Sequence, residues 1–221
     1  MQSGPALAPR AAGGSSRFPY FPCRAGPIEQ ALRLFLTGLL AIGVGWTSAD
    51  AADSVRGSAQ SQDRAEVNAV VWLEAPNPPK VARAERIVLD QRNLTFSPHI
   101  LVVRVGTVVD FPNNDRVFHN VFSFRDGKRF DLGMYPVGTM RQVRFDRPGL
   151  SRIFCNIHPQ MAAYVVVVDT PYFASANRDG AFSIAEVPAG TYTYRAWRPG
   201  GPTLTGTFAS GAGTPLSVKW P

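Results

Sequence analysis

Three residues in the second half of the chain have the types and the spacing of a metal site. Cys155, His158 and Met161 follow one another at intervals of three residues. The whole sequence contains only 3 His, 4 Met and 2 Cys, so this grouping is informative. Thiolate, imidazole and thioether groups are soft ligands, which select copper over magnesium or calcium. The segment therefore predicts a copper site.

A second imidazole must come from another part of the chain. His99 follows Pro98 at the start of a predicted strand and has no soft ligand near it in sequence, so we expect it to be structural. His119 lies directly beyond a turn at 112–116, and we predict that it supplies the second imidazole. Two His and one Cys in a near-trigonal plane, with a long axial Met, form the type 1 (blue) copper electron-transfer site. We therefore predict one copper ion bound by His119, Cys155, His158 and Met161.

The spacing of these ligands also constrains the local backbone. Residues three apart in an extended strand lie on opposite faces of a sheet, so Cys155 and His158 can share an ion only within a tight loop. Asn156 and Pro159 are residue types that suit such a loop. The apolar run at 162–168 then predicts a returning strand.

Short runs of β-branched and aromatic residues predict an all-β chain. Turn sequences separate the runs, for example Pro-Asn-Asn-Asp at 112–115 and Arg-Pro-Gly at 147–149. Many short strands at this spacing favour a sandwich or a barrel. We expect the aromatic side chains near the ligands to lie in the core, and two methionines to serve packing or the rim of the site: Phe118, Phe122, Phe124, Phe154, Met134 and Met140.

The N-terminal segment has the layout of an export signal. Leu32–Trp46 is the only long apolar run; it carries Arg33 near its start and is followed by Ala49-Asp50-Ala51. A membrane span needs roughly 20 apolar residues, and this run is shorter. We therefore predict that 1–51 is a cleaved signal peptide, with a retained anchor as the alternative, and that the protein is periplasmic. The polar segment 52–65 is interpreted as a linker.

Cleavage at this point would remove Cys23 and leave Cys155 as the only cysteine of the exported chain. A single cysteine cannot form an internal disulfide. A free thiol in an oxidising compartment therefore needs burial or a metal, which agrees with the predicted copper site.

Charge and motifs exclude several other functions. The formal net charge is +7, but the Arg and Lys residues are scattered, whereas nucleic-acid binding needs clustered cations. No Ser–His–acid order or Gly-rich phosphate loop is present. We therefore expect neither a nucleic-acid partner nor an enzyme.

The region 95–168 resembles the cupredoxin family. The segment 154–161 (Phe-Cys-Asn-Ile-His-Pro-Gln-Met) is similar to the short ligand loop of the amicyanin and plastocyanin group, and 118–121 (Phe-His-Asn-Val) resembles the family's first-ligand segment. The resemblance implies a Greek-key β-sandwich and the four copper ligands given above. It also implies that Asn120 steadies the ligand loop and that a redox partner docks near His158, beside Pro159 and Ala162.

A second resemblance concerns the C-terminal part of the chain. Residues 179–192 are similar to the carboxypeptidase regulatory-like, transthyretin-like sandwich, whose opening strand would be 68–74. We therefore predict a split second sandwich, with a strand in 66–85 and its main part at 171–221, around a cupredoxin domain at 86–170. Residues 126–140 are interpreted as an insertion whose Met134 and Tyr135 shape the rim of the copper site.

These features favour an exported single-electron carrier with one type 1 copper. The alternatives are a copper-binding or copper-delivery protein, and a cell-envelope interaction module whose second sandwich carries the binding. In the last case the partner would be membrane- or envelope-associated.

Overall fold

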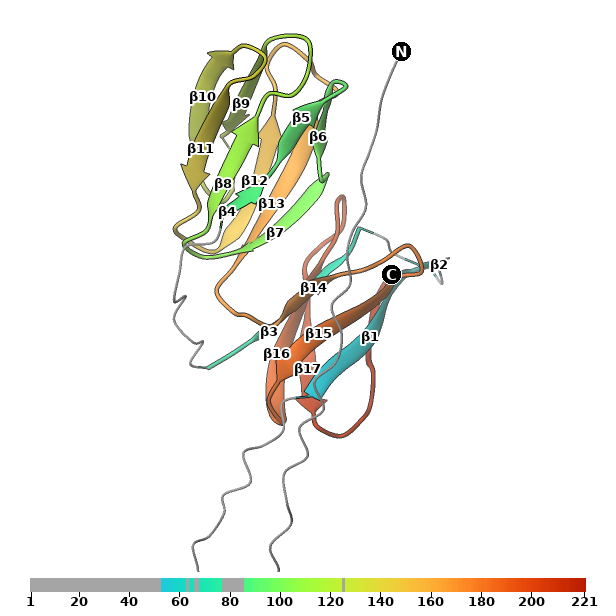
Figure 1. The fold of residues 1–221 in the computed structure, drawn as a ribbon. Helices are drawn as coiled ribbons and strands as arrows, with labels where there is room; N and C mark the ends of the chain where they lie inside the picture. The colour runs from blue at the N-terminus through green and yellow to red at the C-terminus, as the bar shows by residue number, and fades with distance from the viewer. Residues whose placement is uncertain (1–52, 63, 66–67, 77–85, 125) are drawn as a thin grey trace, which may run out of the picture. The chain divides into compact units, whose positions relative to one another are not determined.

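The computed structural model describes residues 53–62, 64–65, 68–76, 86–124 and 126–221 (Figure 1). All regular secondary structure in these ranges is β-strand, which confirms the all-β prediction. None of the described residues belongs to a helix of membrane-spanning length and apolar character. The predicted signal peptide, 1–51, lies outside the described residues.

The first sandwich carries all four predicted ligands. Its larger sheet has the order β10-β9-β12-β13-β7, with β13 and β7 parallel and the other neighbours antiparallel. Its smaller sheet has the order β11-β8-β4, and β5 and β6 form a separate two-stranded hairpin (Figure 1). The strands are β4 (Arg86–Val88), β5 (Asp90–Arg92), β6 (Thr95–Ser97), β7 (Ile100–Arg104), β8 (Val108–Pro112), β9 (His119–Ser123), β10 (Phe130–Tyr135), β11 (Met140–Arg144), β12 (Gly149–Phe154) and β13 (Ala162–Val168).

Side chains that alternate along these strands form one apolar core. On β13, Ala163, Val165 and Val167 belong to this core cluster, as does Ile153 on β12. Removing such side chains from water is the main favourable contribution to folding, at about 25 cal/mol for each Å² of apolar surface. The smaller sheet and β9 contribute further buried residues to the same cluster: Val109, Phe111, Val121 and Val143.

The prediction that four phenylalanines lie in the core is wrong. Phe118 and Phe124 are 53% and 51% exposed, and Phe122 and Phe154 are only partly buried. Because side chains alternate along a strand and Val121 points into the core, Phe122 must point outward. Its ring stacks on Phe124, with centroids 5.7 Å apart, and contacts Phe154 at 5.9 Å. The three rings therefore form an outer aromatic stack.

Tyr135 was expected at the rim of the site but is fully buried. It pairs with His119 across β10 and β9, which turns its side chain into the sandwich. The hydroxyl accepts a hydrogen bond from Gln91 Nε2 at 2.6 Å and donates one to the carbonyl of Phe111 at 3.1 Å. Burial raises the pKa of this phenol, which therefore stays neutral. Met134, its neighbour, is 52% exposed.

The second sandwich combines strands from both ends of the described chain. One sheet has the order β15-β1-β18, with β2 paired to β1, and the other has the order β14-β3-β16-β17. Since β3 precedes the first sandwich in sequence and β14 follows it, the first sandwich is inserted between these two paired strands. The strands are β1 (Asp53–Ser61), β2 (Arg64–Ala65), β3 (Val70–Glu74), β14 (Phe173–Ser175), β15 (Ala181–Val187), β16 (Gly190–Trp197), β17 (Leu204–Ser210) and β18 (Leu216–Trp220).

The interpretation of 52–65 as a linker is wrong, because most of that segment is strand β1. Figure 1 shows β1, in cyan, beside β15. Val55 and Ala59, four residues apart and hence on one face, are buried at 5% and 0% exposure. The ring of Phe182 fills the space that a Cβ at Gly57 would need. The small polar residues of this segment gave no strand pattern in the sequence, but pairing with β15 and β18 on its two sides stabilises the strand.

The hydrogen bonds of Tyr135 generate a prediction on stability. Tyr135→Phe should lower the free energy of unfolding by about 1–2 kcal/mol, because a buried donor and a buried acceptor both lose a partner. Denaturant unfolding followed by far-ultraviolet circular dichroism measures this difference. Tyr194→Phe is the control, since this half-buried hydroxyl has no hydrogen bond to any described residue. Equal stability of the two variants would contradict the prediction.

Candidate metal centre

Two neighbouring strands position the predicted ligands. His119 is the first residue of β9, and Cys155 directly follows β12. Between Cys155 and β13 the chain makes a tight loop, as the ligand spacing predicts. Two backbone hydrogen bonds close it, from Met161 N–H to the carbonyl of His158 at 2.9 Å and from Cys155 N–H to the carbonyl of Met161 at 3.3 Å.

The loop and β9 bring two imidazoles and one thiol together. The Nδ1 atoms of His119 and His158 lie 3.1 Å apart. The sulfur of Cys155 is 3.9 Å from Nδ1 of His119 and 3.6 Å from Nδ1 of His158. His119 is fully buried, Cys155 is 4% exposed and His158 is half-buried. Three potential ligand atoms therefore converge at one protected point.

This arrangement fits a metal ion. An ion about 2.0 Å from each nitrogen and about 2.3 Å from a sulfur leaves these donor atoms roughly 3 to 4 Å apart. The three measured distances lie in that range. The donor set of two imidazoles and one thiolate suits copper. His119, Cys155 and His158 could thus hold the ion that the sequence predicts.

Met161 is the fourth predicted ligand. Its side chain is fully buried and belongs to the same core cluster as Cys155. A buried thioether at this end of the sandwich could supply a weak axial bond to copper. Its role as a ligand stays a prediction.

Asn120 contacts the predicted thiolate through its backbone. Its N–H donates to the sulfur of Cys155 at 3.5 Å, while its side-chain Nδ2 donates to Asp131 at 2.7 Å. Hydrogen bonds of this kind orient a ligand and stabilise the negative sulfur. The resemblance implied such a role for Asn120.

Asp115 was expected only as part of a turn, but it contacts one of the predicted ligands. Its Oδ2 lies 3.0 Å from Nε2 of His119, on the ring edge opposite Nδ1. The N–H groups of Leu94 and Arg116 also donate to this carboxylate, at 2.7 and 2.8 Å. The bond from Leu94, with smaller contributions from Arg116 and His119, lowers the pKa of Asp115 despite the opposing effect of burial. The sequence offered one indication of this contact: Asp115 is a carboxylate four residues before His119, a candidate ligand.

His99 lies outside the cluster. It is exposed, its Nδ1 is 3.1 Å from the carbonyl oxygen of Ala162, and its ring meets the edge of Tyr164 at 5.5 Å.

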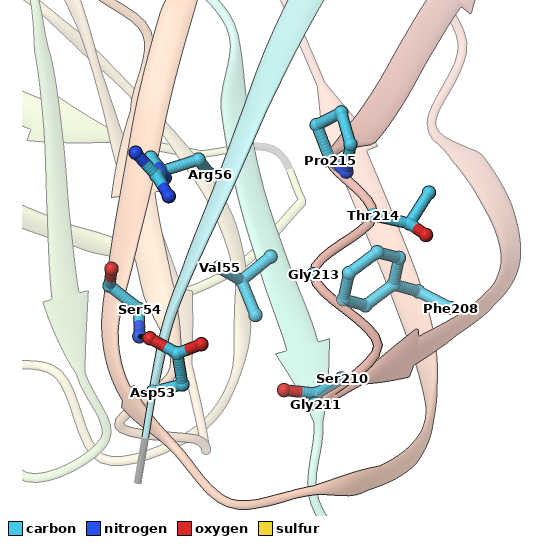
Figure 2. Close-up of a pocket in the computed structure, with 10 residues that line it drawn as sticks. All are labelled: Asp53, Ser54, Val55, Arg56, Phe208, Ser210, Gly211, Gly213, Thr214 and Pro215. Carbon is cyan, nitrogen blue, oxygen red and sulfur yellow. Dashed lines mark hydrogen bonds between the residues drawn. The ribbon is translucent and has the colours of Figure 1, made fainter.

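A hollow of about 300 Å³ in the second sandwich contains none of the predicted ligands. Figure 2 shows it between the start of β1, at Asp53 and Arg56, and the segment around Ser210 and Thr214.

Several solved structures are similar to part of this chain. A purple cupredoxin from Nitrosopumilus maritimus is 28% identical and covers 38% of this chain and 99% of its own, with a TM-score of 0.34. A reduced variant of amicyanin is 24% identical and covers 44% of this chain and 98% of its own, with a TM-score of 0.34. A copper-containing nitrite reductase from Thermus scotoductus is 22% identical and covers 42% of this chain and 25% of its own, with a TM-score of 0.37.

No protein-family model matches the chain, and no curated protein has a matching sequence. Each of the three solved structures covers less than half of the chain. Among the described residues, the convergence of His119, Cys155 and His158 forms a group that could hold a metal ion.

The cluster predicts that His119, and not His99, binds the metal. His119→Ala should weaken copper binding at least 100-fold, since even residues that only orient a ligand contribute 10- to 100-fold. His99→Ala is the matched control and should bind copper like the unchanged protein. Competition with a chromophoric chelator measures both affinities. Equal affinities for the two variants would contradict the assignment of His119.

Proposed function

We propose that this protein is an exported single-electron carrier with one type 1 copper bound by His119, Cys155, His158 and Met161. The observation that carries the proposal is the convergence of one thiol and two imidazoles at a buried point between strands. When bound, copper would supply the Cu(II)/Cu(I) couple, taking one electron from a reduced donor and passing it to an oxidised acceptor.

The residues of the chain favour electron transfer because they hold the ligands in one geometry. His119 is fixed by strand β9 and by Asp115, and the ligand loop is closed by its own backbone hydrogen bonds. Ligands that hardly move between two oxidation states make electron transfer fast. The protein therefore supplies rigidity, and the metal supplies the redox couple.

An electron carrier fits better than an enzyme. Catalytic metal sites keep an open coordination position for water or substrate. Four protein donors would fill the coordination sphere here, and His119, Cys155 and Met161 are all buried. No position is then left for a substrate.

His158 is the proposed route for electrons. It is the half-buried member of the cluster, and its neighbour Ile157 is 43% exposed. Phe118, next to His119, is 53% exposed. An apolar partner surface could dock on these side chains and approach the imidazole of His158, which supports a redox partner at this edge. The sequence of the export signal supports a periplasmic location, and the second sandwich would act as an interaction module.

Copper delivery is the second candidate function. The exposed thioethers of Met134 and Met140, at 52% and 46%, are soft ligands that could pass copper to a partner. A delivery protein must release its metal readily, whereas the cluster described above is buried. Rapid loss of copper to a chelator would favour delivery, and slow loss would favour the electron carrier.

The copper-loaded protein should be intensely coloured in its oxidised form. A thiolate bound to Cu(II) gives a strong visible charge-transfer band, and one electron per protein should bleach it reversibly. Titration with a one-electron reductant, followed by absorbance, measures both properties. Cys155→Ser should abolish the band without loss of the fold. A pale copper-loaded protein would exclude a type 1 site.

Met161 should set the reduction potential more than the colour. Met161→Leu removes an electron donor that stabilises Cu(II), so the potential should rise while the visible band stays. Redox titration measures the shift, and Met134→Leu, at an exposed thioether, is the control. If both variants have the potential of the unchanged protein, Met161 is not an axial ligand.

A further inference from the structure

We infer that Asp115 is a positioning residue of the metal centre, which fixes the proton of His119 on Nε2 and stabilises oxidised copper. The inference rests on the proposed function and extends it to a residue outside the ligand set. Its basis is the contact of 3.0 Å between Asp115 Oδ2 and His119 Nε2.

The contact determines which nitrogen of His119 can bind metal. An ionised carboxylate only accepts hydrogen bonds, so Nε2 must carry the proton in this pair. The lone pair of the neutral ring is then on Nδ1, which faces Cys155 and His158 at 3.9 and 3.1 Å. Asp115 thus prepares His119 for metal binding before any ion arrives.

Three other residues fix Asp115 itself. The N–H groups of Leu94 and Arg116 donate to its two oxygens, Leu94 to Oδ2 and Arg116 to Oδ1. Leu94 lies in the turn between β5 and β6, with a φ of 57°. The buried side chain of Asn113 accepts the N–H of Asp115 at 3.1 Å. The carboxylate therefore has little freedom to leave His119.

The bond to His119 distinguishes this role from that of a turn residue. A purely structural Asp at this position needs only the amides of Leu94 and Arg116. Here the oxygen that accepts from Leu94 also faces the imidazole, and the side chain is 9% exposed. Water therefore screens the charge weakly, and the charge acts on the ring at short range.

A fixed negative charge behind a ligand changes the balance between oxidation states. It makes the imidazole a stronger donor and favours Cu(II), the more highly charged ion, over Cu(I). Asp115 should therefore lower the reduction potential of the site. Asp131, a second carboxylate nearby, accepts from Asn120 Nδ2 and Gly133 N–H and makes no hydrogen bond to a ligand nitrogen or sulfur among the described residues.

The test compares Asp115→Asn with Asp90→Asn in the full, copper-loaded chain. Asn keeps the shape and one acceptor oxygen but loses the charge. Asp90 is the matched control because it lies in the β5–β6 hairpin, whose turn donates to Asp115, and itself binds Asn114 and Arg92. Its substitution removes the same charge from the chain. Visible absorbance shows that the site is intact, and redox titration gives the potential.

We expect Asp115→Asn to favour Cu(I) at least tenfold, a rise of 59 mV for one electron, and Asp90→Asn to change the ratio less than twofold. Equal potentials of the two variants, with the colour retained, would overturn the inference and leave the proposed function standing. A colourless unchanged protein would overturn the proposed function instead.

A second measurement tests the proton position without metal. In the metal-free protein, ¹⁵N NMR should show His119 with its proton on Nε2, and Asp115→Ala should produce a mixture of both tautomers. If Asp115→Ala fails to fold, the tautomer of His119 in the unchanged protein decides this test. A proton on Nδ1 in the unchanged protein would overturn the inference whatever the redox result.

Discussion

The pairing of β9 with β12 is the constraint on which the metal centre depends. Phe122 of β9 and Phe154 of β12 are register partners, and this brings His119 within 3.9 Å of a sulfur that lies 36 residues away in sequence. The pairing of β12 with β13 then closes the loop that adds His158 and Met161. Loss of either pairing would separate the donors, so the fold and the site form together.

Polar groups around the cluster hold the predicted ligands, and further polar groups hold those. Asn120 donates to the sulfur of Cys155, and Asp115 accepts from His119. Asp115 is itself held by two backbone N–H groups, those of Leu94 in the β5–β6 turn and of Arg116. Each of these hydrogen bonds restricts the orientation of the group that it holds. The rigidity that electron transfer requires follows from this network and from the apolar core beneath it.

The sequence predicted the donors better than their surroundings. Cys155, His158 and Met161 are close in sequence, so their spacing alone revealed a loop. Strand alternation made Phe122 face outward, but residue type alone had suggested the core. Strand β1 has few apolar residues and gains its stability from neighbours far along the chain, which no local pattern records. The role of Asp115 depends on a hairpin turn 21 residues away that supplies a hydrogen bond.

X-ray absorption at the copper edge of the loaded protein shows directly which atoms surround the ion. If His119, Cys155 and His158 bind copper, the first shell contains two nitrogen neighbours and one short sulfur neighbour, and the sulfur is lost in Cys155→Ser while the nitrogens remain. A first shell of oxygen and nitrogen alone in the unchanged protein would contradict this assignment, because copper would then be bound somewhere other than between His119, Cys155 and His158.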